Sequence, residues 1–312
     1  MHHPGELQPT LTVSTLGAPG ESLDTVLSWL TGHGARGVEL RLGPGQIAAP
    51  AMTRRERSEL RSRIEDSGLA VTGVASYIRV AEPVADELVV GALEAALILA
   101  HDLGAPAVRV FPGAPVHPCG YDRVPDTVHA RHAANALAAG RLTAVARLAR
   151  DLGTYPALET HDSHPRGSDI AAILDMVDGP AGAVWDLMHP WRVGETLNET
   201  WQALHPWLTG GAGSVQVKDA RLPASRTPAL VGTGTLPVDA FAGLLRDAGY
   251  AGPVCLEWEK AWHPEAPPLD EALGSTVRWF RRHWPARSGP DAAAPRTFPA
   301  PSFPWRHHDR QP

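Results

Sequence analysis

Short apolar runs alternate along the chain with longer segments in which apolar residues recur at helical spacing. Eight short runs rich in β-formers are predicted to be strands: Leu11–Thr15, Gly37–Arg41, Leu69–Ala75, Ala107–Phe111, Tyr155–Thr160, Gly182–Asp186, Ser214–Asp219 and Pro253–Glu259. Each is followed by a segment with a helical pattern: Glu21–His33, Thr53–Asp66, Val84–Leu103, Asp126–Leu152, Asp169–Val177, Glu199–Leu204, Val238–Ala248 and Leu269–His283. This alternation predicts an α/β protein with a parallel sheet.

Eight strand-and-helix units are the number that closes a (β/α)₈ TIM barrel, and residues 10–284 are long enough for one. Several strand runs are almost wholly apolar, as expected when both faces of a strand are buried. A doubly wound open sheet is the alternative, but the first strand lacks the Gly-rich turn that a dinucleotide-binding sheet would carry.

The ends of the chain are predicted to lie outside the barrel. Residues 1–9 form an N-terminal extension, and residues 285–312 contain seven prolines among 28 residues. Such a composition predicts an extended or disordered tail. The alternative is that Phe298, Phe303 and Trp305 dock the tail on the same barrel or on a neighbouring subunit.

The formal net charge of −6, from 28 basic and 34 acidic residues, argues against a general affinity for nucleic acid. No apolar run approaches the roughly 18 residues that would cross a membrane, and the first ten residues contain no apolar signal segment. Two cysteines, Cys119 and Cys255, are too few for a disulfide framework. The expectation is a cytoplasmic protein that acts on a small molecule.

Polar residues with oxygen ligands stand at the ends of four consecutive predicted strands: Glu159, Asp186, Gln216 and Glu257. In a TIM barrel these ends form the catalytic face. A carboxylate that follows a buried run is costly to desolvate unless it is paired or bound to a cation, and oxygen-rich sites suit Mg²⁺ or Mn²⁺. Taken singly, each acid could instead be a helix cap or a solvated group. Glu259 faces the same way as Glu257 but lies further out.

These residues resemble the xylose-isomerase-like barrel superfamily of sugar isomerases and epimerases, over roughly residues 10–284. The segments that carry the resemblance are GVELR, LETH, WDLMH, VQVKDAR, LVGTGTLPVDAF and GYAGPVCLEWEKAW. The resemblance implies one Mn²⁺ or Mg²⁺ held by Glu159, Asp186, Gln216 and Glu257. Gln216 stands where most members have His, although hydroxypyruvate-isomerase-like members carry Gln. Its neutral amide oxygen favours Mn²⁺ or Mg²⁺ over Zn²⁺.

The resemblance also implies proton transfer next to a substrate carbonyl, with Glu159 and Glu257 as the catalytic acid and base. Lys218 and Lys260 are the only lysines in a chain that otherwise uses arginine. Lys218 is expected to be an electrostatic partner of the site carboxylates, whereas Asp162 and Asp219 are expected to be caps. The residues predicted to bind substrate are His189, His161, Arg221, Lys218 and Trp258.

The leading hypothesis is a divalent-metal-dependent isomerase or epimerase of a small sugar, keto acid or polyol derivative. A lyase on the same barrel, such as an inosose or dehydroshikimate dehydratase or a C-glycoside-cleaving enzyme, would share the enolisation step. A non-catalytic sugar-binding barrel has no reason to keep the intact Glu/Asp/Gln/Glu set. An abasic-site endonuclease is disfavoured by the negative net charge and by the lack of a fuller His/Asp set. Members of the resembled superfamily are commonly dimers or tetramers, so a homo-oligomer is one possible state of this protein.

Overall fold

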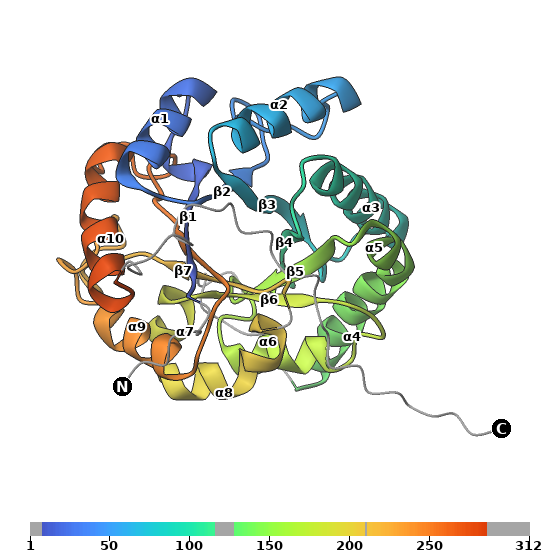
Figure 1. Ribbon diagram of the computed structural model, residues 1–312. Helices are drawn as coiled ribbons and strands as arrows, with labels where there is room; N and C mark the ends of the chain where they lie inside the picture. The colour runs from blue at the N-terminus through green and yellow to red at the C-terminus, as the bar shows by residue number, and fades with distance from the viewer. Residues whose placement is uncertain (1–7, 116–127, 210, 286–312) are drawn as a thin grey trace.

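Eight parallel strands close into a ring in sequence order (Figure 1). The computed structural model describes residues 8–115, 128–209 and 211–285. The strands are β1 (Thr10–Ser14), β2 (Gly37–Arg41), β3 (Ala70–Arg79), β4 (Ala107–Phe111), β5 (Tyr155–Glu159), β6 (Gly182–Asp186), β7 (Ser214–Val217) and β8 (Pro253–Leu256). The ring closes where β1 pairs with β8, with Thr10 opposite Pro253. The predicted (β/α)₈ barrel is therefore confirmed.

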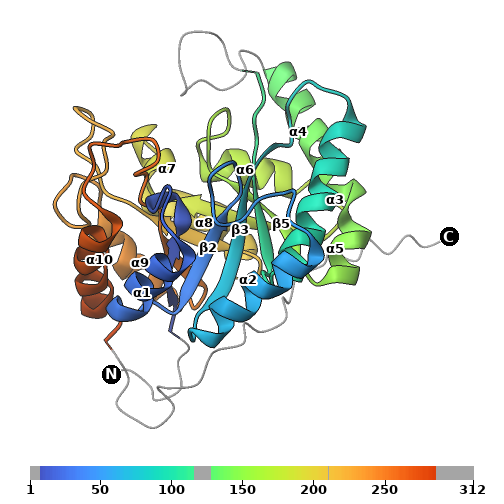
Figure 2. The ribbon, with the colours of Figure 1, turned by 90° about the horizontal axis from the view of Figure 1, so that it is seen from above.

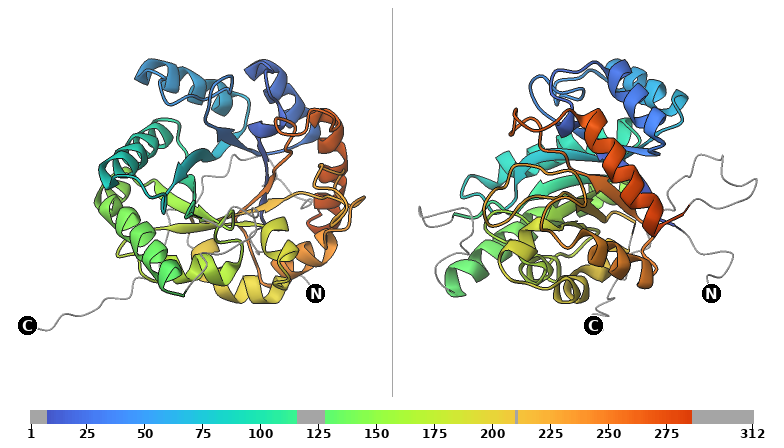
Figure 3. Two further views of the ribbon diagram at one scale, coloured as in Figure 1. Left: turned by 180° about the vertical axis from the view of Figure 1, so that it is seen from behind. Right: turned by 90° about the vertical axis from the view of Figure 1, so that its left-hand side faces the viewer.

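The helices form an outer layer around the strands, as the side and rear views show (Figures 2 and 3). They are α1 (Leu23–His33), α2 (Arg54–Asp66), α3 (Asp86–Asp102), α4 (Val128–Ala144), α5 (Ala146–Leu152), α6 (Gly167–Leu174), α7 (Met188–Arg192), α8 (Leu197–Leu208), α9 (Val238–Asp247) and α10 (Leu269–His283), with a short 3₁₀ turn η1 (Thr15–Gly17) after β1. Helices α2 and α8 begin at complete capping boxes, in which Thr53 and Thr196 are the N-caps. Apolar side chains such as Leu30, Ile64 and Phe241 fill the space between the two layers.

Several element boundaries differ from those predicted. The last two strands end at Val217 and Leu256, so Lys218, Asp219 and residues 257–259 belong to the loops at the mouth of the barrel. The single helix predicted after β4 is two helices, α4 and α5, with Val145 between them. Helix α7 was not predicted, because its five residues are too few to show a helical period.

The inner face of the barrel carries charged residues as well as apolar ones. Glu39 and Arg41 lie two residues apart on β2, and Arg109 lies in the middle of β4. All three side chains are buried. Because side chains on a strand alternate between two faces, residues two apart on β2 share the inward direction. The charges of the barrel mouth therefore come partly from β2 and β4, which carry none of the predicted ligands.

Some predictions concern residues outside the described ranges. These include the extension over residues 1–7, Cys119 in the loop after β4, and the Pro-rich tail beyond residue 285. The proposed division into extension, barrel and tail remains a prediction. Among the described residues, no helix has both the length and the apolar character needed to cross a membrane.

Candidate active site

The four predicted ligands converge at the carboxyl ends of the strands. Glu159 and Asp186 are the last residues of β5 and β6, Gln216 lies in β7, and Glu257 directly follows β8. The strand register places Asp186 beside Gln216. All four side chains are buried, and one carboxylate oxygen from each of the three acids lies within 4.8 Å of the others.

Gln216 has an amide group with no partner among the described residues. It is fully buried, and neither its oxygen nor its nitrogen takes part in a hydrogen bond. Leaving a buried amide unpaired costs about 1–3 kcal/mol, so a ligand for this group is expected. Oδ2 of Asp186 and Oε2 of Glu159 contact only cationic side chains, those of Lys218 at 2.8 Å and Arg109 at 3.2 Å. Three carboxylates and one free amide oxygen fit the ligand preferences of a hard divalent cation.

Lys218 lies among these carboxylates. Its Nζ is 2.8 Å from Asp186 Oδ2 and 2.7 Å from Glu259 Oε1, and it also donates to Glu257 Oε2. Burial would lower the pKa of this ammonium, but the three carboxylates outweigh burial and raise the pKa well above its usual value. Lys218 therefore carries a fixed positive charge inside the predicted ligand set, as an electrostatic partner of the acids.

Two buried arginines complete the charge balance. Arg41 Nη1 is 3.3 Å from Glu257 Oε1, and Arg109 Nη1 is 3.2 Å from Glu159 Oε2. The guanidinium of Arg109 lies over the ring of Phe111 at 4.0 Å, and none of its nitrogens makes a hydrogen bond with a described residue. The sequence analysis missed both arginines. The available signal was a charged residue inside the otherwise apolar strands GVELR and AVRVF.

The two glutamates have opposite pKa shifts. Burial raises the pKa of Glu159 well above its usual value, because the pairing with Arg109 only partly opposes it. For Glu257, burial is outweighed by Lys218, Arg41 and Arg109, which lower the pKa to about 2. Two carboxyl groups whose environments separate their pKa values are the usual arrangement of an acid and a base. Glu257 is therefore ionised at neutral pH, whereas burial makes Glu159 the weaker acid of the two.

The pKa of Asp186 is raised, but Lys218 limits the shift. Burial raises its pKa to about 6, with the nearby carboxylates of Glu257 and Glu259 adding to the effect and Lys218 opposing it. Its Oδ1 accepts a hydrogen bond from the backbone N–H of Met188 at 2.7 Å. That contact fixes the carboxylate at the start of α7 and leaves Oδ2 directed toward Lys218.

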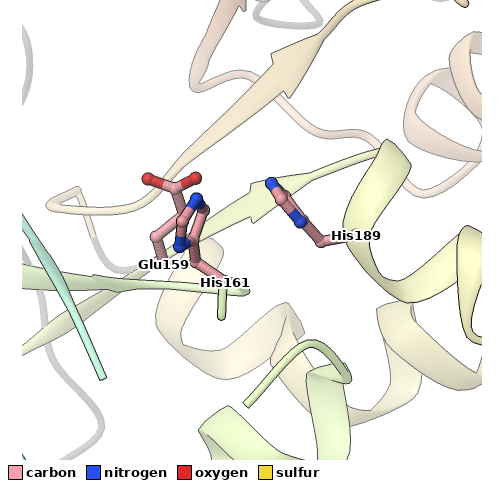
Figure 4. A group of neighbouring side chains, drawn as sticks. All are labelled: Glu159, His161 and His189. Atoms are coloured by element: carbon pink, nitrogen blue, oxygen red, sulfur yellow. The ribbon is translucent and has the colours of Figure 1, made fainter. Parts of the chain in front are cut away.

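Two histidines stand beside Glu159 at the mouth of the barrel (Figure 4). The rings of His161 and His189 have centroids 4.6 Å apart, and His161 also contacts Phe111 at 4.2 Å. Together with Glu159 they form a second group able to hold a metal. Burial lowers the pKa of both imidazoles, so they are neutral at pH 7 and can donate hydrogen bonds to oxygen atoms.

Two residues predicted to bind substrate lie elsewhere. Trp258 is buried in the barrel wall, and its indole N–H donates to the carbonyl of Pro267 at 2.9 Å. It alternates with Glu257 and therefore points away from the site. Arg221 is exposed in the loop after β7 and does not join the buried cluster. The structure gives no support to the predicted substrate-binding roles of Trp258 and Arg221, which remain predictions.

Asp162 and Asp219 were expected to be caps, but neither is a helix N-cap, and both hold loops instead. Asp162 has a positive φ of 38° and accepts hydrogen bonds from the backbone N–H groups of Gly113 and Ser163. Asp219 accepts from the N–H groups of Ala220, Gly232, Gly234 and Leu236. These carboxylates therefore tie down the loops next to the site and are not part of the ligand set.

The arrangement of the strands agrees with sequence comparison. The family model of xylose isomerase-like TIM barrels matches residues 27–283. The chain belongs to this family. No curated protein sequence matches it.

Solved structures share the fold of this xylose isomerase-like barrel at low sequence identity. They include the probable 3-DHS dehydratase AsbF of Bacillus anthracis, with 16% identity, a TM-score of 0.66, and coverage of 86% of this chain and 97% of that chain. D-psicose 3-epimerase of Clostridium cellulolyticum H10 has 14% identity and a TM-score of 0.66, over 88% and 98% of the two chains. An IolI protein with a bound zinc atom has 14% identity and a TM-score of 0.68, over 88% and 99%. At this identity the likeness shows the fold alone.

Proposed function

We propose that this protein is a divalent-metal-dependent isomerase or epimerase that enolises a small sugar, keto acid or polyol derivative. The observation that carries the proposal is the convergence of three buried carboxylates with a buried, unpartnered amide at the catalytic face of the barrel. Structural neighbours with the same fold include sugar epimerases and a dehydratase, which supports an enzyme.

The residues proposed to hold one Mn²⁺ or Mg²⁺ are Glu159, Asp186, Gln216 and Glu257. When bound, the ion would polarise the carbonyl and hydroxyl oxygens of the substrate and stabilise the charge of an enediolate. The harder amide oxygen of Gln216, in place of an imidazole, favours these ions over Zn²⁺.

Proton transfer is assigned to the two glutamates. One of them would take a proton from carbon and the other would return it. Each has a cation beside it, since Glu257 is paired with Lys218 and Arg41 and Glu159 is paired with Arg109. The two lie on β5 and just after β8, on different sides of the barrel, and can therefore act on opposite faces of one substrate carbon.

The proposed contacts to substrate oxygens come from His161, His189 and Arg109. The histidines are neutral donors at the mouth. Arg109 pairs with Glu159 through Nη1, and its Nε and Nη2 have no hydrogen-bond partner among the described residues. A buried guanidinium of this kind is suited to a carboxylate or an enediolate oxygen. This observation favours the keto acids within the proposed substrate class, and it keeps a dehydratase on the same barrel as the second candidate function.

Metal titration tests the ligand set. Wild-type protein titrated with MnCl₂ is expected to bind about one ion per chain. Gln216→His should keep Mn²⁺ binding because imidazole can replace the amide oxygen as a ligand, whereas Gln216→Leu should weaken it because a hydrocarbon has no lone pair. Equal Mn²⁺ affinity in the Leu variant and in the wild type would remove Gln216 from the site.

Hydrogen exchange tests the chemistry. In D₂O, with Mn²⁺ at saturation, the enzyme should exchange a carbon-bound hydrogen of a true substrate, sought among D-fructose, D-tagatose and hydroxypyruvate. Glu159→Gln and Glu257→Gln should each keep most Mn²⁺ binding and lose roughly 10²–10⁴-fold in exchange rate. Glu259→Gln, which alters a carboxylate outside the ligand set, should exchange at close to the wild-type rate. Undiminished exchange in both of the first two variants would exclude these residues from the mechanism.

A further inference from the structure

The ammonium of Lys218 occupies the same carboxylates that are proposed to hold the metal. Its side chain is 4% exposed, and that of Asp186 is fully buried. The ammonium contacts Asp186 and Glu257, which belong to the proposed ligand set, and Glu259, which does not. The lysine thus bridges the metal site and a carboxylate beside it.

A divalent cation and this ammonium cannot both stay on the same oxygens. Two positive charges that share the oxygens of Asp186 and Glu257 would lie only a few ångströms apart in a buried site, where their repulsion is poorly screened. Removing the lysine from these oxygens without another partner would leave a buried, unpaired charge, which is also costly.

Glu259 supplies the other partner. Its Oε1 is 2.7 Å from Nζ of Lys218, and its side chain is 19% exposed, so it faces the outer side of the cluster. The ammonium can therefore keep one carboxylate while it gives up the other two. No other described residue with an acidic side chain is in salt-bridge contact with Lys218.

We propose that Lys218 is an internal counterion that holds the carboxylates in the metal-free protein and withdraws to Glu259 when a divalent cation binds. The inference rests on the proposed function, because it requires a cation at this site. It assigns Glu259 a positioning role as the residue that receives the ammonium. Metal affinity is then set by an exchange of one cation for another, and the metal-free barrel is stable because its acids are already paired.

Two substitutions should change Mn²⁺ affinity in opposite directions. Lys218→Met removes the competing charge, so the affinity measured by calorimetry should rise by about tenfold or more, within the usual range of coupling between two sites. Its metal-free form should melt at a lower temperature than the wild type, because Asp186 and Glu257 lose their cation. Glu259→Gln leaves the ammonium on the ligands, so Mn²⁺ affinity should fall by several-fold.

A double variant of Lys218 and Glu259 tests whether the two residues affect Mn²⁺ binding through each other or independently. With Lys218 replaced by Met, the additional Glu259→Gln change should have almost no effect on Mn²⁺ affinity, because there is no ammonium left to receive. Lys260→Met is the matched control. The Nζ of Lys260 donates to the carbonyls of Pro264 and Ala266 and not to the site, so its removal should leave Mn²⁺ affinity unchanged.

The Mn²⁺ affinities of these variants distinguish failure of the exchange from failure of the proposed function. Weaker Mn²⁺ binding in a folded Lys218→Met variant, or unchanged binding in Glu259→Gln, would overturn the exchange. If Lys218→Met does not fold, the fall in affinity in Glu259→Gln, absent in Lys260→Met, still tests the proposal. If the wild type binds Mn²⁺ and Lys218→Met binds it no more tightly, only the exchange fails. If neither binds Mn²⁺, the proposed metal-dependent function fails with it.

Discussion

At the scale of single residues, His164 links stability to pH. It is fully buried, and its ring is hydrogen bonded to Ser163 Oγ at 2.8 Å and Asn135 Oδ1 at 2.9 Å. Burial lowers its pKa from 6.5 to about 4. Between these values the unfolded chain binds a proton that the folded protein does not, so His164 makes stability fall as pH drops from 6.5 to 4. The full loss is about 3–4 kcal/mol, because the pKa falls from 6.5 to about 4 and each unit is worth about 1.4 kcal/mol.

Urea unfolding at pH 7 and pH 4.5 measures this dependence. His164→Gln should lose much less stability over that range than the wild type, because an amide does not titrate. The exposed His205→Gln is the control and should keep the wild-type slope. A His164→Gln slope equal to that of the wild type would assign the acid sensitivity to other groups.

At the scale of elements, the loop between β7 and α9 depends on one carboxylate. The buried Asp219 accepts hydrogen bonds of 2.9–3.2 Å from four backbone N–H groups of this loop, those of Ala220, Gly232, Gly234 and Leu236. Asp219→Ala should therefore lower the free energy of unfolding by about 3 kcal/mol or more, since bonds to a charged acceptor are each worth about 1.5–3 kcal/mol. The exposed Asp66→Ala should change it by no more than about 0.5 kcal/mol. Denaturant titration of both variants makes the comparison, and a similar small effect at Asp219 would show that water replaces its bonds.

At the scale of the whole molecule, the metal should stabilise the entire barrel. Its four proposed ligands come from four consecutive strands, β5 to β8, and β8 closes the ring against β1. A ligand that binds only the folded state stabilises it by about 2.7 kcal/mol at 100 times its dissociation constant. For a chain of this size, that free energy corresponds to an upward shift of several degrees in the melting temperature.

Calorimetric melting with and without MnCl₂ checks this expectation. One cooperative transition that moves upward as a whole is expected, because the strands that carry the proposed ligands are joined to the N-terminal half by the β4–β5 and β8–β1 pairs. A shift of part of the transition, with the rest unmoved, would mean that the barrel unfolds in separate sections.

The barrel, and the meeting of the four proposed ligands at one end of it, could be predicted from the sequence. Apolar runs at strand length, each followed by a helical period, leave few architectures other than eight βα units. Because strand ends form the catalytic face, Glu159, Asp186, Gln216 and Glu257 could be placed near one another before any coordinates. Alternation along the chain also places the side chain of Trp258 opposite to that of Glu257. The prediction that Trp258 binds substrate did not take this into account.

Only the tertiary structure decided which charges meet. Arg109 on β4 lies beside Glu159 because β4 and β5 are paired neighbours, whereas Arg41 on β2 reaches Glu257 only because β1 and β8 close the ring. The contact between Lys218 and Glu259 depends on two side chains that leave their strands beyond the last paired residue. The alternation of side chains along a strand fixes whether a residue points into the barrel. Which charged side chains then meet depends on the strand order, on ring closure and on the paths of the loops. The separation of the pKa values of Glu159 and Glu257 depends on those partners, so it could not be read from the chain alone.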